Sequence, residues 1–417
     1  MTRTQSFCFS AAILGLCCLS FAESISAADV WPQWRGPNRD GRVEQTDWPA
    51  AFDKNLTAKF QVPLSDGYSG PIVSADRIFV TETAGKQETV RALDRQSGEQ
   101  IWKAEWSGSM TVPFFAMANG SWIRSTPALA DDRLIVASME DVLYCLATSD
   151  GSVLWQVDFR KEFGTGNQSF GFVCSPLVWN DFVFVQTNAG LIKLNLSDGA
   201  VAWRGLNQDG GMMGGAFSSP VLAEIEGVTQ LVVQTREKLC GILPESGKEL
   251  WAVPVPAFRG MNILTPTVIG NRIFTSTYGG GSFLFEVTSA DSGFAVKELW
   301  KNKVEGYMSS PVVHGGNIFL HLRNQRVVCI AADSGETRWT SRPFGKYWSM
   351  VASGDQCLAL DERGELVLFR LSGESFEVID RQKVSESPTW AHLAVVDDLV
   401  LVRSLKDLQA YRWSAAP

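Results

Sequence analysis

The sequence predicts an all-β protein that folds as one closed propeller of eight four-stranded antiparallel blades, with an N-terminal strand completing the last blade. Three observations lead to this prediction: tryptophans recur roughly every 50 residues, turn glycines precede them at a fixed distance, and paired hydrophobic runs open with proline. Repeats of roughly 40–50 residues that each hold four short strands are typical of propeller blades.

Six tryptophans mark the repeat. Successive members are 53, 48, 48, 49 and 39 residues apart, and five of the six stand four positions after a turn glycine. A polar turn followed at a fixed distance by a bulky aromatic residue indicates a hairpin whose second strand carries a packing anchor. The six anchors are Trp102, Trp155, Trp203, Trp251, Trp300 and Trp339.

A second signal runs in parallel with the first. In each unit a proline follows Gly, Ser or Thr and opens a hydrophobic run, and in five units a second run starts seven residues later, after a turn pair such as Asp131-Asp132. Proline at the first residue of a strand removes no hydrogen bond that the sheet needs. The prolines are Pro71, Pro127, Pro176, Pro220, Pro266 and Pro311.

Two weaker units, at residues 350–357 and 392–399, bring the count to eight. The eighth unit ends at Trp413 without room for a fourth strand. Residues 56–62 are predicted to form a strand that precedes the first unit and belongs to none of the eight as they stand in sequence. Joining these two ends closes the ring. A propeller of seven blades is the alternative, if residues 345–385 are an insertion.

The first 28 residues have the features of a secretory signal peptide: Arg3, an apolar run over residues 7–22, and small residues before position 29. We therefore expect an exported protein, periplasmic or secreted, with a lead-in segment at 29–55 and the propeller at 56–417. Lipoprotein anchoring at Cys17 is disfavoured because Leu16 stands where a small residue is usual. No later stretch is apolar over enough residues to predict a transmembrane helix.

Composition narrows the class of partner. The formal net charge of −8 argues against nucleic acid or an anionic membrane, both of which need a basic surface. The cysteines outside the predicted signal peptide are widely spaced and odd in number, which indicates neither a disulfide framework nor a zinc site. We expect buried free thiols in a monomeric protein. These cysteines are Cys145, Cys174, Cys240, Cys329 and Cys357.

Residues 92–102 have the sequence ALDRQSGEQIW, which resembles the pyrroloquinoline-quinone (PQQ) repeat, and residues 331–339 are similar. The opening WPQWRGPNRDG at 31–41 resembles the lead-in of exported bacterial PQQ-like propeller proteins. This resemblance implies that the six tryptophans dock one blade against the next. Members include quinoprotein dehydrogenases, which hold PQQ and calcium in the central funnel, and the scaffold lipoprotein of the outer-membrane β-barrel assembly machinery, which binds proteins and no cofactor.

The sequence does not contain the catalytic motifs of the quinoprotein dehydrogenases. Their vicinal cysteine pair has a counterpart only at Cys17-Cys18, inside the predicted signal peptide, and no compact acidic motif indicates a calcium site. We therefore predict no catalytic residue and no metal ligand, while PQQ and calcium remain possible cofactors. Of the three histidines, His314 and His392 suit structural roles, and only His321, near Arg323, is a candidate for function.

In a propeller, the segments that join an outer strand to the next inner strand surround one mouth of the central funnel. Here they are rich in aromatic residues, Met, Arg and Asn, a composition that suits a ligand or a peptide; the alternative is that these side chains plug the channel and pack between loops. The candidate binding residues are Trp122, Arg124, Phe172, Phe217, Arg259, Asn262, Tyr307, His321, Arg323, Trp348 and Trp390.

Three hypotheses of function remain. The preferred one, based on this surface, is a non-catalytic binding or scaffold protein of the cell envelope, with envelope proteins or peptides as partners. The first alternative, which the repeat resemblance implies, is a PQQ- and calcium-dependent dehydrogenase of alcohols or sugars. The second is a polysaccharide-binding propeller whose aromatic residues stack on a glycan.

Overall fold

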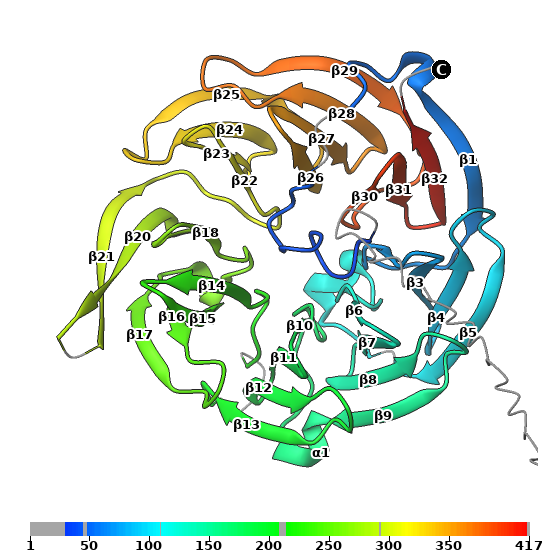
Figure 1. Cartoon of the computed structure of the whole chain (residues 1–417), viewed down its shortest axis with the longest axis horizontal. Helices are drawn as coiled ribbons and strands as arrows, with labels where there is room; N and C mark the ends of the chain where they lie inside the picture. Colours follow the sequence, from blue (N-terminus) through cyan, green and yellow to red (C-terminus); the bar gives the residue numbers. More distant parts are fainter. Residues whose placement is uncertain (1–29, 45–47, 109, 208–213, 292, 415–417) are drawn as a thin grey trace, which may run out of the picture.

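The computed structural model describes residues 30–44, 48–108, 110–207, 214–291 and 293–414. The predicted signal peptide at 1–28 and Cys17 lie outside these residues. Within them, the strands form eight four-stranded sheets that stand around a central axis (Figure 1). The predicted eight-bladed propeller is confirmed, and the seven-bladed alternative is wrong because residues 348–383 form a complete blade.

The strands of each blade follow one another from the axis outward. The first four blades comprise β2 (Ile72–Val73), β3 (Arg77–Ala84), β4 (Gln87–Asp94) and β5 (Gln100–Ser107); β6 (Ala128–Ala130), β7 (Arg133–Ala137), β8 (Val142–Ala147) and β9 (Val153–Asp158); β10 (Leu177–Trp179), β11 (Phe182–Thr187), β12 (Gly190–Asn195) and β13 (Val201–Gly205); β14 (Val221–Ile225), β15 (Val228–Gln234), β16 (Lys238–Ile242) and β17 (Glu249–Pro254).

The other four blades have the same order. They comprise β18 (Thr267–Ile269), β19 (Arg272–Thr277), β20 (Gly281–Ala290) and β21 (Gly293–Asn302); β22 (Val312–His314), β23 (Asn317–His321), β24 (Arg326–Ala331) and β25 (Thr337–Pro343); β26 (Trp348–Ser353), β27 (Gln356–Asp361), β28 (Glu365–Arg370) and β29 (Glu377–Lys383); β30 (Ala394–Val396), β31 (Leu399–Arg403), β32 (Asp407–Trp413) and β1 (Leu56–Pro63). Short helices lie outside the blades: η2 (Asp53–Asn55), η3 (Phe114–Asn119), α1 (Phe159–Phe163) and η4 (Phe258–Gly260).

Burial explains why the inner strands read as continuous hydrophobic runs. In β8 the first five residues are all buried, whereas in the neighbouring outer strand β9 the only buried residue is Trp155. A strand inside a blade has a neighbouring blade on both faces, so both faces must be apolar. An outer strand lies at the solvent-exposed rim of its blade and therefore contains more polar residues.

The ring closes in blade 8, where chain ends that are far apart in sequence meet. β1 pairs antiparallel with β32, from Leu56 opposite Trp413 to Pro63 opposite Asp407. The predicted closure is therefore confirmed. Phe60 takes the tryptophan position of this blade, since its ring lies against the turn glycine Gly98 of blade 1.

Five of the six repeat tryptophans contact the next blade in one way. The indole Nε1–H of Trp102 donates to Thr148 O at 2.8 Å, and a Cβ added at Gly151 would lie 2.5 Å from the same indole ring. Trp155, Trp203, Trp300 and Trp339 donate to the next blade's turn at 2.8–2.9 Å. For Trp102, Trp155, Trp203 and Trp300, the turn glycine of the next blade also provides the surface on which the indole lies.

Trp251 differs from the other five. Its Nε1–H donates to Gln230 Oε1 of its own blade at 2.7 Å, and its indole lies over Gly241. The next blade has no Ser-Gly or Asp-Gly turn at the matching position, because β20 and β21 extend beyond it as a longer hairpin. Trp251 therefore has no turn glycine to lie on.

The lead-in segment at 30–44 crosses the central channel rather than running along the outside of the ring (Figure 1). Trp31 forms a β-bridge with Val73, the last residue of β2, and Arg42 forms one with Ala352, near the end of β26. Both contacts lie at the ends of innermost strands. The segment therefore closes the end of the channel opposite the loops that join outer to inner strands.

Two buried arginines fix this segment to separate blades. Arg39 donates to Pro176 O at 2.7 Å and to Ser175 O at 3.0 Å in blade 3, and Arg35 donates to Pro311 O at the start of blade 6. Arg35 and Arg39 are 1% and 2% exposed, and burial lowers the pKa of both side chains to about 10. The lead-in thus spans the channel between blades on different sides of the ring.

The cysteine prediction is confirmed, since the five cysteines of the described chain are free and buried. Burial raises the pKa of Cys145 to about 12 and that of Cys174 to about 11, which keeps both thiols protonated and unreactive. No helix in the part of the chain that the structure describes has the length and apolarity to cross a membrane.

Candidate functional site

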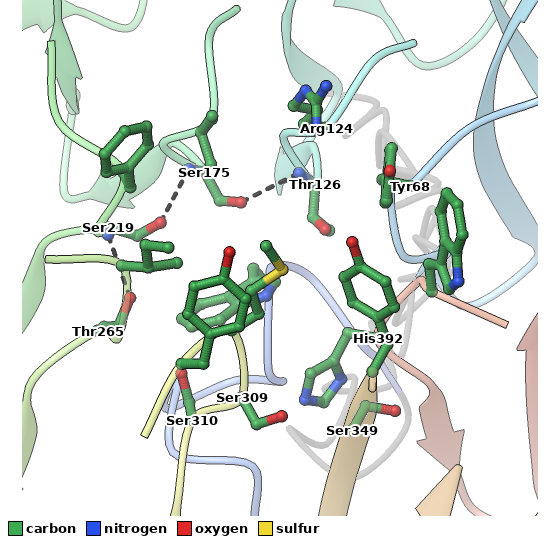
Figure 2. Close-up of a pocket in the computed structure, with 18 of the residues that line it drawn as sticks. Tyr68, Arg124, Thr126, Ser175, Ser219, Thr265, Ser309, Ser310, Ser349 and His392 are labelled. Atoms are coloured by element: carbon green, nitrogen blue, oxygen red, sulfur yellow. Dashed lines mark hydrogen bonds between the residues drawn. The ribbon is translucent and has the colours of Figure 1, made fainter. Parts of the chain in front are cut away.

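A cavity of about 220 Å³ occupies the centre of the ring on the side of the loops that join outer to inner strands. All eight of these loops contribute to its lining. Figure 2 shows side chains from several blades surrounding the cavity. Two kinds of side chain predominate: aromatic rings (Trp34, Tyr68, Phe170, Phe217, Tyr307, Tyr347, Trp348 and Trp390) and hydroxyls (Thr126, Ser175, Ser219, Thr265, Ser309, Ser310 and Ser349).

The hydroxyls of blades 2 to 5 form a hydrogen-bonded series around part of the axis. Gly70 N–H donates to Thr126 Oγ1 at 3.1 Å, and Thr126 N–H donates to Ser175 Oγ at 3.0 Å. The series continues from Ser175 N–H to Ser219 Oγ at 2.9 Å and from Ser219 N–H to Thr265 Oγ1 at 3.1 Å (Figure 2). Each hydroxyl of this series accepts a hydrogen bond from the preceding blade, which fixes the first five blades to one another.

An aromatic wall lies on one side of the cavity. Tyr68 stacks on Trp390 with ring centroids 4.9 Å apart and lies 5.6 Å from Trp122. Tyr347 lies 5.0 Å from Trp390, and the guanidinium of Arg124 is 5.0 Å from the Tyr68 ring. These rings come from loops that precede blades 1, 2, 7 and 8, so the wall is built only when the ring is closed.

Burial dominates the electrostatics of this wall. It raises the pKa of Tyr68 well above its usual range and that of Tyr347 to about 12. Burial also lowers the pKa of Arg124, although an arginine stays charged under all ordinary conditions. The Tyr68 hydroxyl is buried and has no hydrogen bond of normal geometry. The wall therefore combines neutral phenols with one cation.

The floor of the cavity comes from the lead-in segment and the last blade. Trp34 lines the cavity and lies 6.2 Å from the His392 ring, edge to face. His392 Nδ1 lies 2.8 Å from Leu393 O, so Nδ1 carries the hydrogen and Nε2 is the acceptor. Burial and then the charge of Arg35 lower the pKa of His392 to about 3. The imidazole is neutral at physiological pH.

Five of the predicted binding residues line this cavity, namely Arg124, Phe217, Tyr307, Trp348 and Trp390. A sixth, Trp122, belongs to the aromatic wall, 6.1 Å from Trp390, but does not itself line the cavity. The sequence therefore identified the loops that surround the cavity and part of its lining.

Three predicted residues are not part of the rim. Phe172 is 1% exposed and packs in the blade core against Phe159. Asn262, also 1% exposed, donates to backbone carbonyls, among them Val255 O at 3.2 Å. His321 stacks on Trp348 behind the cavity, where burial lowers its pKa to about 4. All three serve the packing of the structure.

Arg259 and Arg323 lie on the same face but away from the cavity. Arg259 is exposed in η4, over the ring of Phe258. Arg323 stacks on Tyr278 at 4.2 Å and pairs with Glu305 at 3.1 Å. Neither side chain lines the central cavity.

Sequence reasoning missed the hydroxyl series, Tyr68, Trp34 and the position of His392. A signal for the series was present, because Ser or Thr precedes the first-strand proline in five units, including Thr126-Pro127 and Ser175-Pro176. That residue lies just before the innermost strand of its blade, so its side chain lies near the axis.

The cavity does not fit a calcium-bound quinone. Calcium takes about 6–8 oxygen ligands, usually with several carboxylates, whereas the described residues that line the cavity include no Asp or Glu. In the described parts of the chain, no group of three or more His, Cys, Asp or Glu side chains could hold a metal ion. The volume of about 220 Å³ is also below the roughly 300–1,000 Å³ of typical small-molecule pockets.

A buried carboxylate supports one wall of the cavity from behind. Asp141 accepts hydrogen bonds from Gln168 Nε2 at 2.7 Å and from Asn188 N–H at 3.2 Å. Gln168 O in turn accepts from Gly171 N–H in the loop of Phe170, which lines the cavity. Burial raises the pKa of Asp141 to about 6.

We expect Asp141 to make the protein less stable as pH rises. Its folded pKa of about 6 lies above the usual value near 4, so its contribution to the free energy of unfolding falls by up to about 3 kcal/mol between pH 4 and pH 6. Urea unfolding of wild type and Asp141→Asn across pH 4–8 measures this difference. His321 and His392, whose folded pKa values are lowered, act in the opposite sense in both proteins and cancel. Equal pH dependence in the two proteins would contradict the assignment.

Comparison with known proteins places this geometry in a family. The family profile of the outer membrane protein assembly factor BamB matches residues 86–341, more than half of the chain. BamB of Yersinia pestis is 24% identical over 289 residues, which cover 66% of this chain and 67% of that protein.

Solved structures share the fold. The crystal structure of BamB from Moraxella catarrhalis matches with a TM-score of 0.62 and 14% identity, over 86% of this chain and 99% of that chain. Quinohemoprotein alcohol dehydrogenase from Comamonas testosteroni matches with a TM-score of 0.64 and 11% identity, over 94% of this chain and 82% of that chain. At these identities the likeness shows the fold alone. The match of the family profile shows more: the chain belongs to the PQQ-like β-propeller family of the outer membrane protein assembly factor BamB.

Proposed function

We propose that this chain is an exported scaffold protein of the bacterial cell envelope, which binds a segment of another envelope protein at the mouth of its central cavity. The relatives named as outer membrane protein assembly factors support an envelope role. The features of a signal peptide in residues 1–28 support export to the periplasm.

This proposal rests on one observation: the central funnel is open at one end and closed at the other. The cavity opens among the loops, and the chain's own lead-in segment closes its other end with Trp34. Its walls offer aromatic faces and hydroxyls, which bind apolar groups and backbone amides. Because the part of its lining that the structure describes contains neither a carboxylate nor a cationic histidine, the site is better suited to holding a group than to acid–base chemistry.

Site-specific photo-crosslinking tests this function. We would place p-benzoylphenylalanine at Phe170 or Met308, both in the cavity lining, and at Lys103 on an exposed outer strand as the control. Irradiation of intact cells should give discrete protein adducts from the two cavity positions and none from the control. Adducts only from Lys103, or glycan instead of protein at the cavity positions, would contradict the proposal.

Removal of the aromatic wall should weaken capture. In the double variant Trp122→Ala and Trp390→Ala, we expect the adducts at Met308 to fall several-fold, since both rings stack against Tyr68 beside the opening. The matched control is Trp106→Ala, whose ring stacks on Tyr144 between blades 1 and 2. Equal loss in both variants would indicate general destabilisation.

A further inference from the structure

Arg124 is the only permanently charged side chain among the described residues that line the cavity. It follows the loop of η3, and its guanidinium lies over the Tyr68 ring (Figure 2). A cation in aromatic surroundings, away from bulk water, needs a compensating partner.

The hydrogen bonds of Arg124 within the described chain include no carboxylate that would compensate its charge. Its Nη2 donates to Gly120 O at 2.8 Å and makes a longer contact of 3.5 Å with Asn119 O, while its Nε is buried without a hydrogen-bond partner. The ionisable groups that act on its charge are the neutral phenols of Tyr68 and Tyr347. The charge is therefore not neutralised by any carboxylate of the described chain.

Arg323 shows what a complete arrangement looks like on the same face. It also stacks on a tyrosine, Tyr278, at 4.2 Å, but Glu305 pairs with it at 3.1 Å. The difference between the two arginines is the carboxylate.

We propose, on the basis of the proposed function, that Arg124 binds the carboxylate of a bound peptide at the edge of the funnel. Arginine donates strong charge-assisted hydrogen bonds to a carboxylate. The cavity beside it accommodates one apolar side chain next to that carboxylate.

The surroundings of Arg124 favour a peptide over a free small molecule. The last residue of η3, Asn119, lines the cavity, while Phe114 and Met117 of the same helix are 84% and 67% exposed. An apolar surface thus continues from the opening over the loop face. A ligand whose end enters the funnel has further surface on which its chain can lie.

Fluorescence polarisation with three labelled peptides tests this inference. The probes are dansyl-Gly-Gly-Leu with a free C-terminus, the same peptide as its amide, and dansyl-Gly-Asp-Leu amide. We expect wild type to bind at least one carboxylate peptide roughly tenfold more tightly than the uncharged amide. The tighter of the two identifies the source of the carboxylate, a chain end or an acidic side chain.

Variants connect this preference to Arg124. Arg124→Gln should abolish the preference, Arg124→Lys should keep part of it, and the matched control Arg323→Gln should leave it unchanged. Near-UV circular dichroism verifies that each variant is folded. A preference that survives Arg124→Gln, or equal binding of all three peptides to wild type, would overturn the inference.

Two further outcomes keep the inference separate from the proposed function. If the protein prefers carboxylate peptides but gives no crosslinks in cells, the scaffold role is contradicted and the anion site is supported. If it gives crosslinks in cells but shows no preference for carboxylate peptides, the scaffold role is supported and the anion site is contradicted. Displacement of the labelled peptide by PQQ at lower concentration than by unlabelled peptide would overturn the inference in favour of the cofactor.

Discussion

Replacing Arg39 with alanine is expected to lower the free energy of unfolding by about 3–5 kcal/mol, since it removes charge-assisted hydrogen bonds to two buried backbone carbonyls and leaves a cavity where the side chain packed. The guanidinium donates to Pro176 O and Ser175 O and lies 5.7 Å from the Trp34 ring. Its removal leaves two buried carbonyls without donors and a cavity beneath the floor of the funnel. Urea unfolding followed by tryptophan fluorescence measures the change.

Arg39→Met separates the two causes. Methionine fills much of the space without hydrogen bonding, so we expect an intermediate loss, of roughly 1–3 kcal/mol, from the unsatisfied carbonyls alone. The surface arginine Arg412, which pairs with Asp398 at 2.6 Å in a solvent-exposed position, provides the control. If Arg39→Ala is no more destabilising than Arg412→Ala, the lead-in does not stabilise the ring.

The second large effect is expected at a blade joint. Gly151 has φ +75°, and a Cβ there would lie 2.5 Å from the Trp102 ring. Gly151→Ala should therefore lose roughly 3–5 kcal/mol, because it combines backbone strain with overpacking at the joint.

The control for this joint is Gly270→Ala. Gly270 also has positive φ, +61°, but no atom would lie within 4 Å of its Cβ. Its substitution should cost only about 1 kcal/mol from backbone strain. Thermal or urea unfolding of both variants compares them. Equal losses would show that the contact of Trp102 with the next blade adds nothing to stability.

Much of the fold could be predicted because the residues that define the repeat act within a single hairpin. The Ser-Asp-Gly turn and the following tryptophan belong to one hairpin, as at Gly151 and Trp155. Phe60 could be assigned to the closing strand because it stands at the same position relative to its strand as the tryptophans. These patterns depend on neighbours in the chain.

Contacts that depend on the next blade could not be predicted. Trp251 has the same local sequence as the other anchors, yet it turns to Gln230 because the turn glycine of blade 5, Gly293, lies at the end of the longer hairpin of β20 and β21. Whether a tryptophan finds a docking surface is decided about 45 residues later in the chain. A pattern within one repeat contains no information about it.

The site shows the same limit. Sequence placed the aromatic loops around the funnel but not the direction of each side chain, so that Arg124 lines the cavity while Phe172 points into the blade core. The sealing of the channel was also missed, because nothing in residues 30–44 indicates that two arginines reach blades 3 and 6. Long-range packing decides both.

The order in which the chain is made has a consequence for how this protein matures. Leu56 pairs with Trp413, so during synthesis one edge of the first strand stays unpaired until the last strand is available. Unpaired strand edges of this kind aggregate, and topologies dominated by distant pairings form slowly. A product that lacks only its final ten residues would lose most of β32, and β1 and β31 would then both have an unpaired edge in the last blade.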